Sequence, residues 1–111
     1  MPEEKRCHKH YPVSGKTLFQ TESQEATGEL VDIARGGVCI RSEVKPLDGE
    51  ELTVRFTVQD HIGVFEIRGM VVRVQSNSWA MIFLEEPMEM ETLLRSLAEK
   101  AEKQVASPTC T

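Results

Sequence analysis

The residues from Glu51 to Val58 alternate strictly between polar and apolar side chains. Apolar residues occupy every second position and polar residues lie between them: Leu52, Val54, Phe56 and Val58 alternate with Glu51, Thr53, Arg55 and Thr57. Successive side chains of a β-strand point to opposite faces of its sheet, so this pattern predicts a strand with one buried and one solvated face. It is the clearest periodicity in the chain and favours a β-rich fold.

Five other runs have strand character, and turn signals separate them. The predicted strands cover residues 12–20, 28–33, 38–42, 64–74 and 79–84, and the intervening segments 21–27, 44–50, 60–63 and 75–78 are polar or rich in turn-forming residues. Six short strands in this order predict a mainly β fold, a six-stranded antiparallel barrel or a curled sheet.

The run from Val64 to Val74 changes phase along its length. Phe65 and Ile67 predict one inward face, whereas the apolar residues after Gly69 predict the other; these are Met70, Val72 and Val74. A change of phase at a glycine within a strand predicts a β-bulge or a sharp bend at Gly69. Bends of this kind allow a small sheet to close and lose its exposed edges.

The chain changes character after Pro87. Leucine and alanine recur there at helical spacing, and charged residues fill the other positions: the apolar stripe is Leu93, Leu94, Leu97, Ala98 and Ala101. This spacing predicts an amphipathic helix over about residues 88–104 whose apolar stripe packs against the barrel. Any part of the stripe left exposed would favour a partner site or a homodimer.

The length and composition bound the domain organisation and the location. A chain of 111 residues predicts one domain, here residues 12–104, with a basic N-terminal arm at 1–11 and a flexible tail at 105–111. The N-terminal residues form no apolar run, so we expect no signal peptide and no membrane insertion. Three widely spaced cysteines do not suggest a disulfide framework, which favours the cytoplasm.

Two segments predict a binding site. In Asp32-Ile33-Ala34-Arg35-Gly36-Gly37 an acidic residue precedes two glycines between two strand-like runs, which predicts a tight turn that a ligand can approach. Residues 5–10, Lys-Arg-Cys-His-Lys-His, contain three of the 13 Lys and Arg residues and none of the 18 acidic residues in a chain of net charge −5. A basic arm on an acidic body favours one small anionic ligand and argues against a nucleic acid polymer.

These segments and their order resemble the PilZ domain family over roughly residues 5–100. The family pairs an Arg-x-x-x-Arg motif with a downstream Asp/Asn-x-Ser-x-x-Gly motif. The first corresponds here to Arg6 through His10 and the second to Asp32 through Gly37, and the strand Gly69-Met70-Val71-Val72-Arg73-Val74 is also typical of the family. The resemblance implies a six-stranded barrel with a C-terminal helix that binds cyclic di-GMP, a bacterial second messenger, and that requires no other cofactor.

The resemblance also implies which residues contact the ligand. Carried over position by position, they are Arg6, His10, Asp32, Ala34 and Gly37, with Lys5, Lys9, Gly36 and Trp79 as additional candidates. His10 stands at the second arginine of the family motif and Ala34 at its serine, and together these departures cost about 2–4 kcal/mol of binding free energy. The resemblance therefore implies a stand-alone effector of weakened affinity in motility or biofilm regulation. The alternative is an adapter that has lost the ligand and binds a protein partner.

Other interpretations of the same residues remain open at this point. Gly36 and Gly37 suit a hairpin whether or not a ligand binds, and Trp79 suits a buried strand as well as a stacking role. Cys7, His8 and His10 have donor atoms that zinc accepts, but no fourth ligand lies near them in the sequence. No nucleophile–base arrangement indicates an enzyme. The few aromatic residues and the acidic body argue against a single-strand-binding barrel.

Overall fold

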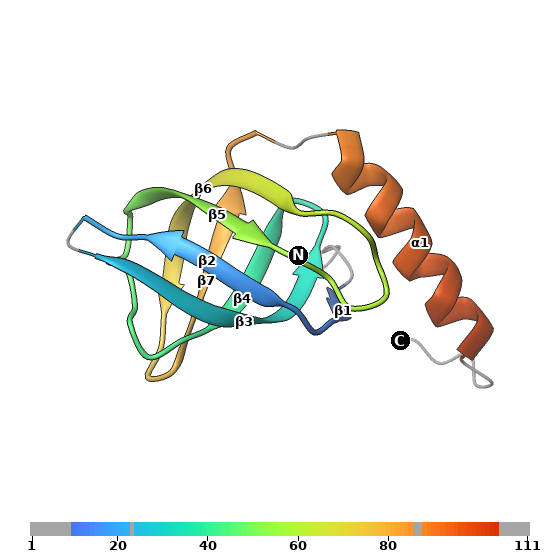
Figure 1. The fold of residues 1–111 in the computed structure, drawn as a ribbon, viewed down its shortest axis with the longest axis horizontal. Helices are drawn as coiled ribbons and strands as arrows, with labels where there is room; N and C mark the ends of the chain where they lie inside the picture. Colours follow the sequence, from blue (N-terminus) through green and yellow to red (C-terminus); the bar gives the residue numbers. More distant parts are fainter. Residues whose placement is uncertain (1–9, 23, 86–87, 105–111) are drawn as a thin grey trace, which may run out of the picture.

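The computed structural model describes residues 10–22, 24–85 and 88–104 and shows a closed β-barrel with a helix beside one end of it (Figure 1). The strands are β1 (His10–Pro12), β2 (Lys16–Gln20), β3 (Glu25–Ala34), β4 (Gly37–Arg41), β5 (Glu51–Phe56), β6 (Phe65–Val74) and β7 (Ser78–Phe83), followed by α1 (Met88–Gln104). Strands β2 to β7 form a six-stranded antiparallel barrel that the pairing of β3 with β4 closes, and β1 adds a seventh strand on β3. The predicted barrel and terminal helix are confirmed.

The barrel interior is filled by one residue in two from each strand, as the alternation predicted. Phe19, Val54, Phe56, Ile67 and Trp79 are all at most 2% exposed. Trp79 lies at the centre of this packing, with its ring edge-on to Phe19 at 4.9 Å between centroids. Its indole Nε1 donates a hydrogen bond of 2.9 Å to Ser42 Oγ, so the polar atom of the largest core residue is satisfied.

Helix α1 adds its apolar stripe to the same core. Met90, Leu93, Leu94 and Leu97 are buried and belong to one hydrophobic cluster with the barrel interior. The predicted stripe therefore packs against the barrel at Leu93, Leu94 and Leu97, with Ala98 partly buried at its margin, and the side chain of Ala101 lies outside the described part of the chain. Within the part of the chain that the structure describes, no helix combines the length and the apolar composition needed to cross a bilayer.

The first predicted strand, 12–20, is two strands that share β3 as a partner. β1 pairs with the second half of β3 and β2 with its first half. The residues between them change partners, because Gly15 accepts from Leu30 N at 2.9 Å while Ser14 accepts from Gln59 N at 2.7 Å. A continuous strand across 12–20 is therefore wrong, and the break turns β1 onto a different part of β3.

The predicted turn over 21–27 is also too long. β3 begins at Glu25, and the reversal is confined to a few residues in which Thr21 N donates to Gln24 O at 2.8 Å. Ala26 points into the core and Glu25 and Thr27 face solvent. The polar composition of this segment belongs to the solvated face of a strand, and cross-strand pairing with β2 decides its conformation.

The change of phase in β6 lies three residues later than predicted. Gly69 and Val71 continue the inward face of Phe65 and Ile67, and the register shift against β7 falls between Val71 and Arg73. Val72 is 47% exposed, and Met70 and Val74 do not join the core. Gly69 is needed for packing, because a Cβ there would lie 2.7 Å from Met81 Sδ and 2.5 Å from Ile82 O. The bulge at Gly69 and the inward Met70, Val72 and Val74 are therefore wrong.

Candidate functional site

The acidic-glycine turn joins β3 to β4 as predicted. Ala34 pairs with Gly37, so Arg35 and Gly36 form a two-residue hairpin turn. Gly36 has φ of +93°, a conformation that favours glycine, and the space beside it is open. Gly37 has a packing reason, since a Cβ there would lie 2.8 Å from Met81 O of β7. Both glycines therefore have a structural reason in the hairpin that does not depend on a ligand. Of the two, only Gly36 adjoins free space.

Strand β1 brings the end of the basic arm onto the acidic turn. His10 pairs with Ala34 and Pro12 with Asp32, although the two members of each pair are twenty or more positions apart in the sequence. His10 Nδ1 lies 3.3 Å from Asp32 Oδ1, with side chains 68% and 29% exposed. Tyr11 packs partly buried against the core and fixes β1 from the inside. The last residue of the first motif and the first residue of the second therefore meet on the barrel wall.

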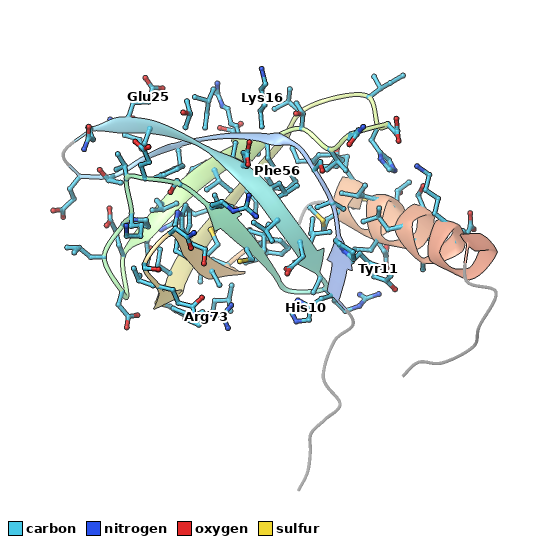
Figure 2. The ribbon with its side chains drawn as sticks, turned by 90° about the horizontal axis from the view of Figure 1, so that it is seen from below. His10, Tyr11, Lys16, Glu25, Phe56 and Arg73 are labelled. Atoms are coloured by element: carbon cyan, nitrogen blue, oxygen red, sulfur yellow. The ribbon has the colours of Figure 1, made fainter. Side chains whose placement is uncertain are left out.

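A row of outward-facing residues continues from Asp32 across the wall. Asp32 lies opposite Cys39 of β4, Cys39 opposite Ala80 of β7, and Ala80 opposite Arg73 of β6. Directly opposed residues in antiparallel strands have Cβ atoms about 5 Å apart, so the row is continuous. Figure 2 shows Arg73 and His10 at the same side of the barrel, away from Lys16 and Glu25. The small side chains of Cys39 and Ala80 form a floor between an acidic end and a basic end.

The charges along this row act on the Cys39 thiol. Burial raises the pKa of Cys39, and the negative charge of Asp32 raises it further. Arg73 lowers the pKa of Cys39 through its positive charge and through a hydrogen bond, and Arg41 lowers it through its charge alone. The net direction keeps the thiol protonated at neutral pH, so Cys39 is a poor nucleophile. The strand pairing likewise places Asp32 and Arg73 on either side of Cys39 in the row.

Arg73 was missed as a site residue. The predicted phase and the observed one both place Arg73 on the outer face, but its place in the row of Asp32 and Cys39 depends on the strand registers, which the sequence does not show. With the bulge at Val72, Arg73 faces outward in the row of Asp32 and Cys39. The signal in the sequence is the run Met70-Val71-Val72, where three adjacent apolar residues interrupt the alternation directly before this arginine.

The remaining predicted positions divide into three groups. Ala34 is 4% exposed and forms part of the wall between His10 and Gly37. Trp79 is 0% exposed, so its ring offers no face on which a ligand could stack and the core interpretation applies. Lys5, Arg6, Cys7, His8 and Lys9 lie outside the described residues. Among the described residues no group of three or more His, Cys, Asp or Glu side chains is placed to hold a metal ion.

Comparisons with known proteins agree with this fold. The model of the PilZ domain matches residues 3–100. The fold is similar to the structure of the inhibitor of motility MotI/DgrA of Bacillus subtilis, with TM-score 0.77 and 16% identity over 92% of this chain; the chain spans about half of that structure, 54%. It is also similar to the PilZ domain of YcgR from Escherichia coli with cyclic di-GMP, with TM-score 0.68 and 16% identity over 91% of this chain and 97% of that one.

A third similar structure is the PilZ domain of CeSA from a cellulose-synthesising bacterium, with TM-score 0.59 and 12% identity over 85% of this chain and 98% of that one. At these identities the structures establish the fold alone. No curated protein matches the sequence. The family match covers most of the chain, and the order of strands, the closed barrel and the terminal helix agree with it, so the chain belongs to the PilZ domain family.

Proposed function

We propose that this chain binds cyclic di-GMP on the outer wall of the barrel, with weakened affinity, and acts as an effector in second-messenger signalling rather than as an enzyme. The observation that carries the proposal is the placement of His10 beside Asp32 and opposite Ala34. That placement brings the last residue of the first family motif beside the second motif. The PilZ domain of YcgR, of similar fold, was solved with cyclic di-GMP, which supports the same ligand class here.

The chemistry of the wall suits a guanine nucleotide with two phosphates. The Asp32 carboxylate accepts hydrogen bonds, and guanine carries N–H donors on its edge. Arginine matches the guanine O6 and N7 acceptors or a phosphate with two parallel hydrogen bonds. Arg73 lies on the described wall, and Arg6 belongs to the arm that leads into β1. In this proposal Lys5 and Lys9 act as point charges toward the phosphates.

The weakened affinity follows from the two departures from the motif. His10 cannot present a guanidinium fork, and Ala34 has no hydroxyl. The combined loss of about 2–4 kcal/mol corresponds to about 30- to 1000-fold in the dissociation constant. Restoring both groups should therefore raise the affinity for cyclic di-GMP, and this gain tests the proposal.

The experiment is a calorimetric titration of cyclic di-GMP into the full chain and into the double variant His10→Arg/Ala34→Ser. The expected result is binding that tightens by at least about tenfold in the double variant. Thr27→Arg, which adds the same group at an exposed position of β3 beside β2, is the matched control and should leave the affinity unchanged. If neither the wild type nor the double variant releases heat at high micromolar concentration, cyclic di-GMP is not the ligand of this wall.

The second candidate is a ligand-independent adapter that binds a protein in pilus or motility control. The same two departures favour it, because they remove the groups that read the nucleotide. MotI/DgrA, of similar fold, is named as an inhibitor of motility. Absence of heat in both titrations, with an intact fold by circular dichroism, would support this candidate over the first.

A further inference from the structure

We propose that an apolar groove between the β5–β6 loop and helix α1 binds a basic amphipathic segment of a partner protein. The groove is a cavity of about 600 Å³ whose lining includes Ile62, Val64, Phe65 and Leu93. None of its lining residues belongs to the row of Asp32, Cys39, Ala80 and Arg73. The inference goes beyond nucleotide binding and holds whether or not cyclic di-GMP binds.

The apolar side chains of the loop face solvent. Ile62 is 101% exposed and Val64 is 65% exposed, so neither is covered by the rest of the molecule. Phe65 and Leu93 form the partly and fully buried base of the same cavity. Solvated aliphatic side chains that adjoin a concave apolar base are typical of an interaction site. A partner that covers them buries their apolar surface away from water, which is favourable.

The loop is held in this conformation by contacts with α1. His61 Nε2 lies 3.3 Å from Ser96 Oγ, and Lys100 Nζ lies 3.8 Å from Asp60 Oδ2. His61 N also donates to Val58 O at 3.0 Å and closes a turn. Asp60 and Gly63 have positive φ angles of 71° and 106°. Figure 1 shows this loop reaching from the barrel toward α1. The exposure of Ile62 is therefore imposed by a tethered loop.

The charges at the groove select the chemistry of the occupant. Glu66 and Glu89 are the charged residues that line the cavity and both are acidic. Glu66 is engaged by Arg55 at 3.4 Å in an exposed ion pair, which is weak in water. A segment with large apolar side chains on one face and Lys or Arg beside them would fill the groove and meet these carboxylates.

A second copy of this chain is a poor occupant on the same grounds. A two-fold symmetric contact places a surface patch against itself, so Glu66 and Glu89 would face their own equivalents. The chain as a whole has a net charge of −5, which adds repulsion between copies. A basic partner meets neither obstacle.

The test uses two synthetic peptides of helical amphipathic pattern, one of Leu and Lys and one of Leu and Glu, titrated into the full chain by fluorescence anisotropy. The Leu/Lys peptide should bind at least about tenfold more tightly than the Leu/Glu peptide. The double variant Ile62→Ser/Val64→Ser should weaken the Leu/Lys peptide by about tenfold or more. Leu47→Ser, at an apolar residue 70% exposed in another loop, is the control and should change nothing.

A second variant and the mapping of amide chemical shifts test whether the peptide binds in the groove itself. Glu66→Gln/Glu89→Gln should weaken the Leu/Lys peptide severalfold and leave the Leu/Glu peptide unaffected or strengthened. Amide chemical shifts should change at residues 61–66 and 88–96. The proposal is overturned if Ile62→Ser/Val64→Ser binds as the wild type does, or if the shifts change elsewhere. It is also overturned if light scattering shows a dimer that this variant converts to a monomer.

Discussion

The wall formed by β3, β4 and β7 has an inner and an outer face that are fixed in different ways. On the inner face Ile33, Ile40 and Trp79 are 0% exposed and belong to one cluster. On the outer face His10 and Asp32 meet through a single solvated contact of 3.3 Å. The inner face is held by many packed neighbours, whereas the outer face has groups free to exchange partners with a ligand. Because strand side chains alternate, residues adjacent in sequence serve opposite purposes.

The largest expected effect is on the inner face, from Trp79→Ala. Removal of a fully buried indole leaves a cavity and removes the hydrogen bond that Ser42 Oγ accepts, although Ser42 Oγ still donates to Val44 O. The free energy of unfolding should therefore fall by about 3–5 kcal/mol. Urea unfolding followed by circular dichroism measures the change. Ala80→Ser, at the adjacent and partly exposed outward position, is the matched control and should have a small effect. Equal losses in the two variants would contradict the division of the wall.

Gly69→Ala tests the close packing of β6 against β7. The added Cβ would lie within 3 Å of Met81 Sδ and of Ile82 O, and the backbone oxygen cannot move away cheaply. The free energy of unfolding should fall by about 1–3 kcal/mol. Val72→Ala at the exposed bulge position should cost much less. A Gly69→Ala variant as stable as the wild type would contradict the close packing of β6 against β7 at this position.

Arg73→Gln tests the outer face and separates binding from folding. The substitution removes a guanidinium from the exposed end of the row, so cyclic di-GMP binding should weaken by about 1–3 kcal/mol, or roughly 5- to 150-fold in the dissociation constant. The free energy of unfolding measured in urea should change by less than about 0.5 kcal/mol, as it does for most substitutions of exposed residues. Arg55→Gln on the β2–β5 side of the barrel serves as the control, since it removes the same group outside the row. Unchanged binding in Arg73→Gln would remove Arg73 from the site.

Thr17→Val tests a polar atom of the barrel interior. Thr17 is 1% exposed, and its Oγ1 has no hydrogen-bond partner among the described residues. Replacing the hydroxyl with a methyl group removes this unpaired polar atom, so the free energy of unfolding should rise by about 1 kcal/mol. Thr53→Val on the solvated face of β5 should have no such effect. A loss of stability in Thr17→Val would indicate that the hydroxyl has a partner in solution.

The smallest expected effect is on the reactivity of Cys39 in the absence of ligand. Burial and the Asp32 charge raise the pKa of Cys39, so at pH 7–8 the thiol should react with a disulfide reagent more slowly than a solvated cysteine. Asp32→Asn removes one cause of the raised pKa and should speed the reaction. Arg73→Gln removes an opposing charge and should slow it. These rates are measured in a Cys7→Ser/Cys110→Ser background, so that only Cys39 reacts. If Asp32→Asn and Arg73→Gln both react at the rate of this background, neither group acts on Cys39.

The sequence was sufficient for the barrel because its pattern repeats along most strands. Leu52, Val54 and Phe56 alternate without interruption, and α1 begins and ends at the predicted residues. The prediction failed where the partner strand decides the geometry. The register shift of β6 falls between Val71 and Arg73, and Gly69 packs closely on Met81, and both features depend on the pairing with β7. The polar segment at Glu25 is a strand because β2 pairs with it.

The candidate site was predictable in part for a related reason. Asp32 and Gly36 were identified from a local motif, and local motifs can be recognised without knowing the register. The resemblance to the family supplied His10 and Ala34, and the structure brings both to the turn. Arg73 depends on a row that crosses four strands, and Trp79 depends on which face of β7 points inward. Neither property can be taken from a motif alone.

The most direct test of the central claim is calorimetric titration of cyclic di-GMP at pH 5.5 and pH 8, with wild type, His10→Gln and Arg6→Ala. An imidazolium at His10, beside Asp32 and the turn, would attract a dianion more strongly than a neutral imidazole would. Wild type should bind more tightly at pH 5.5, His10→Gln should lose most of that difference, and Arg6→Ala should bind weakly at both. A wild-type affinity that is the same at both pH values would contradict the participation of His10, and no binding at either pH would contradict the nucleotide site itself.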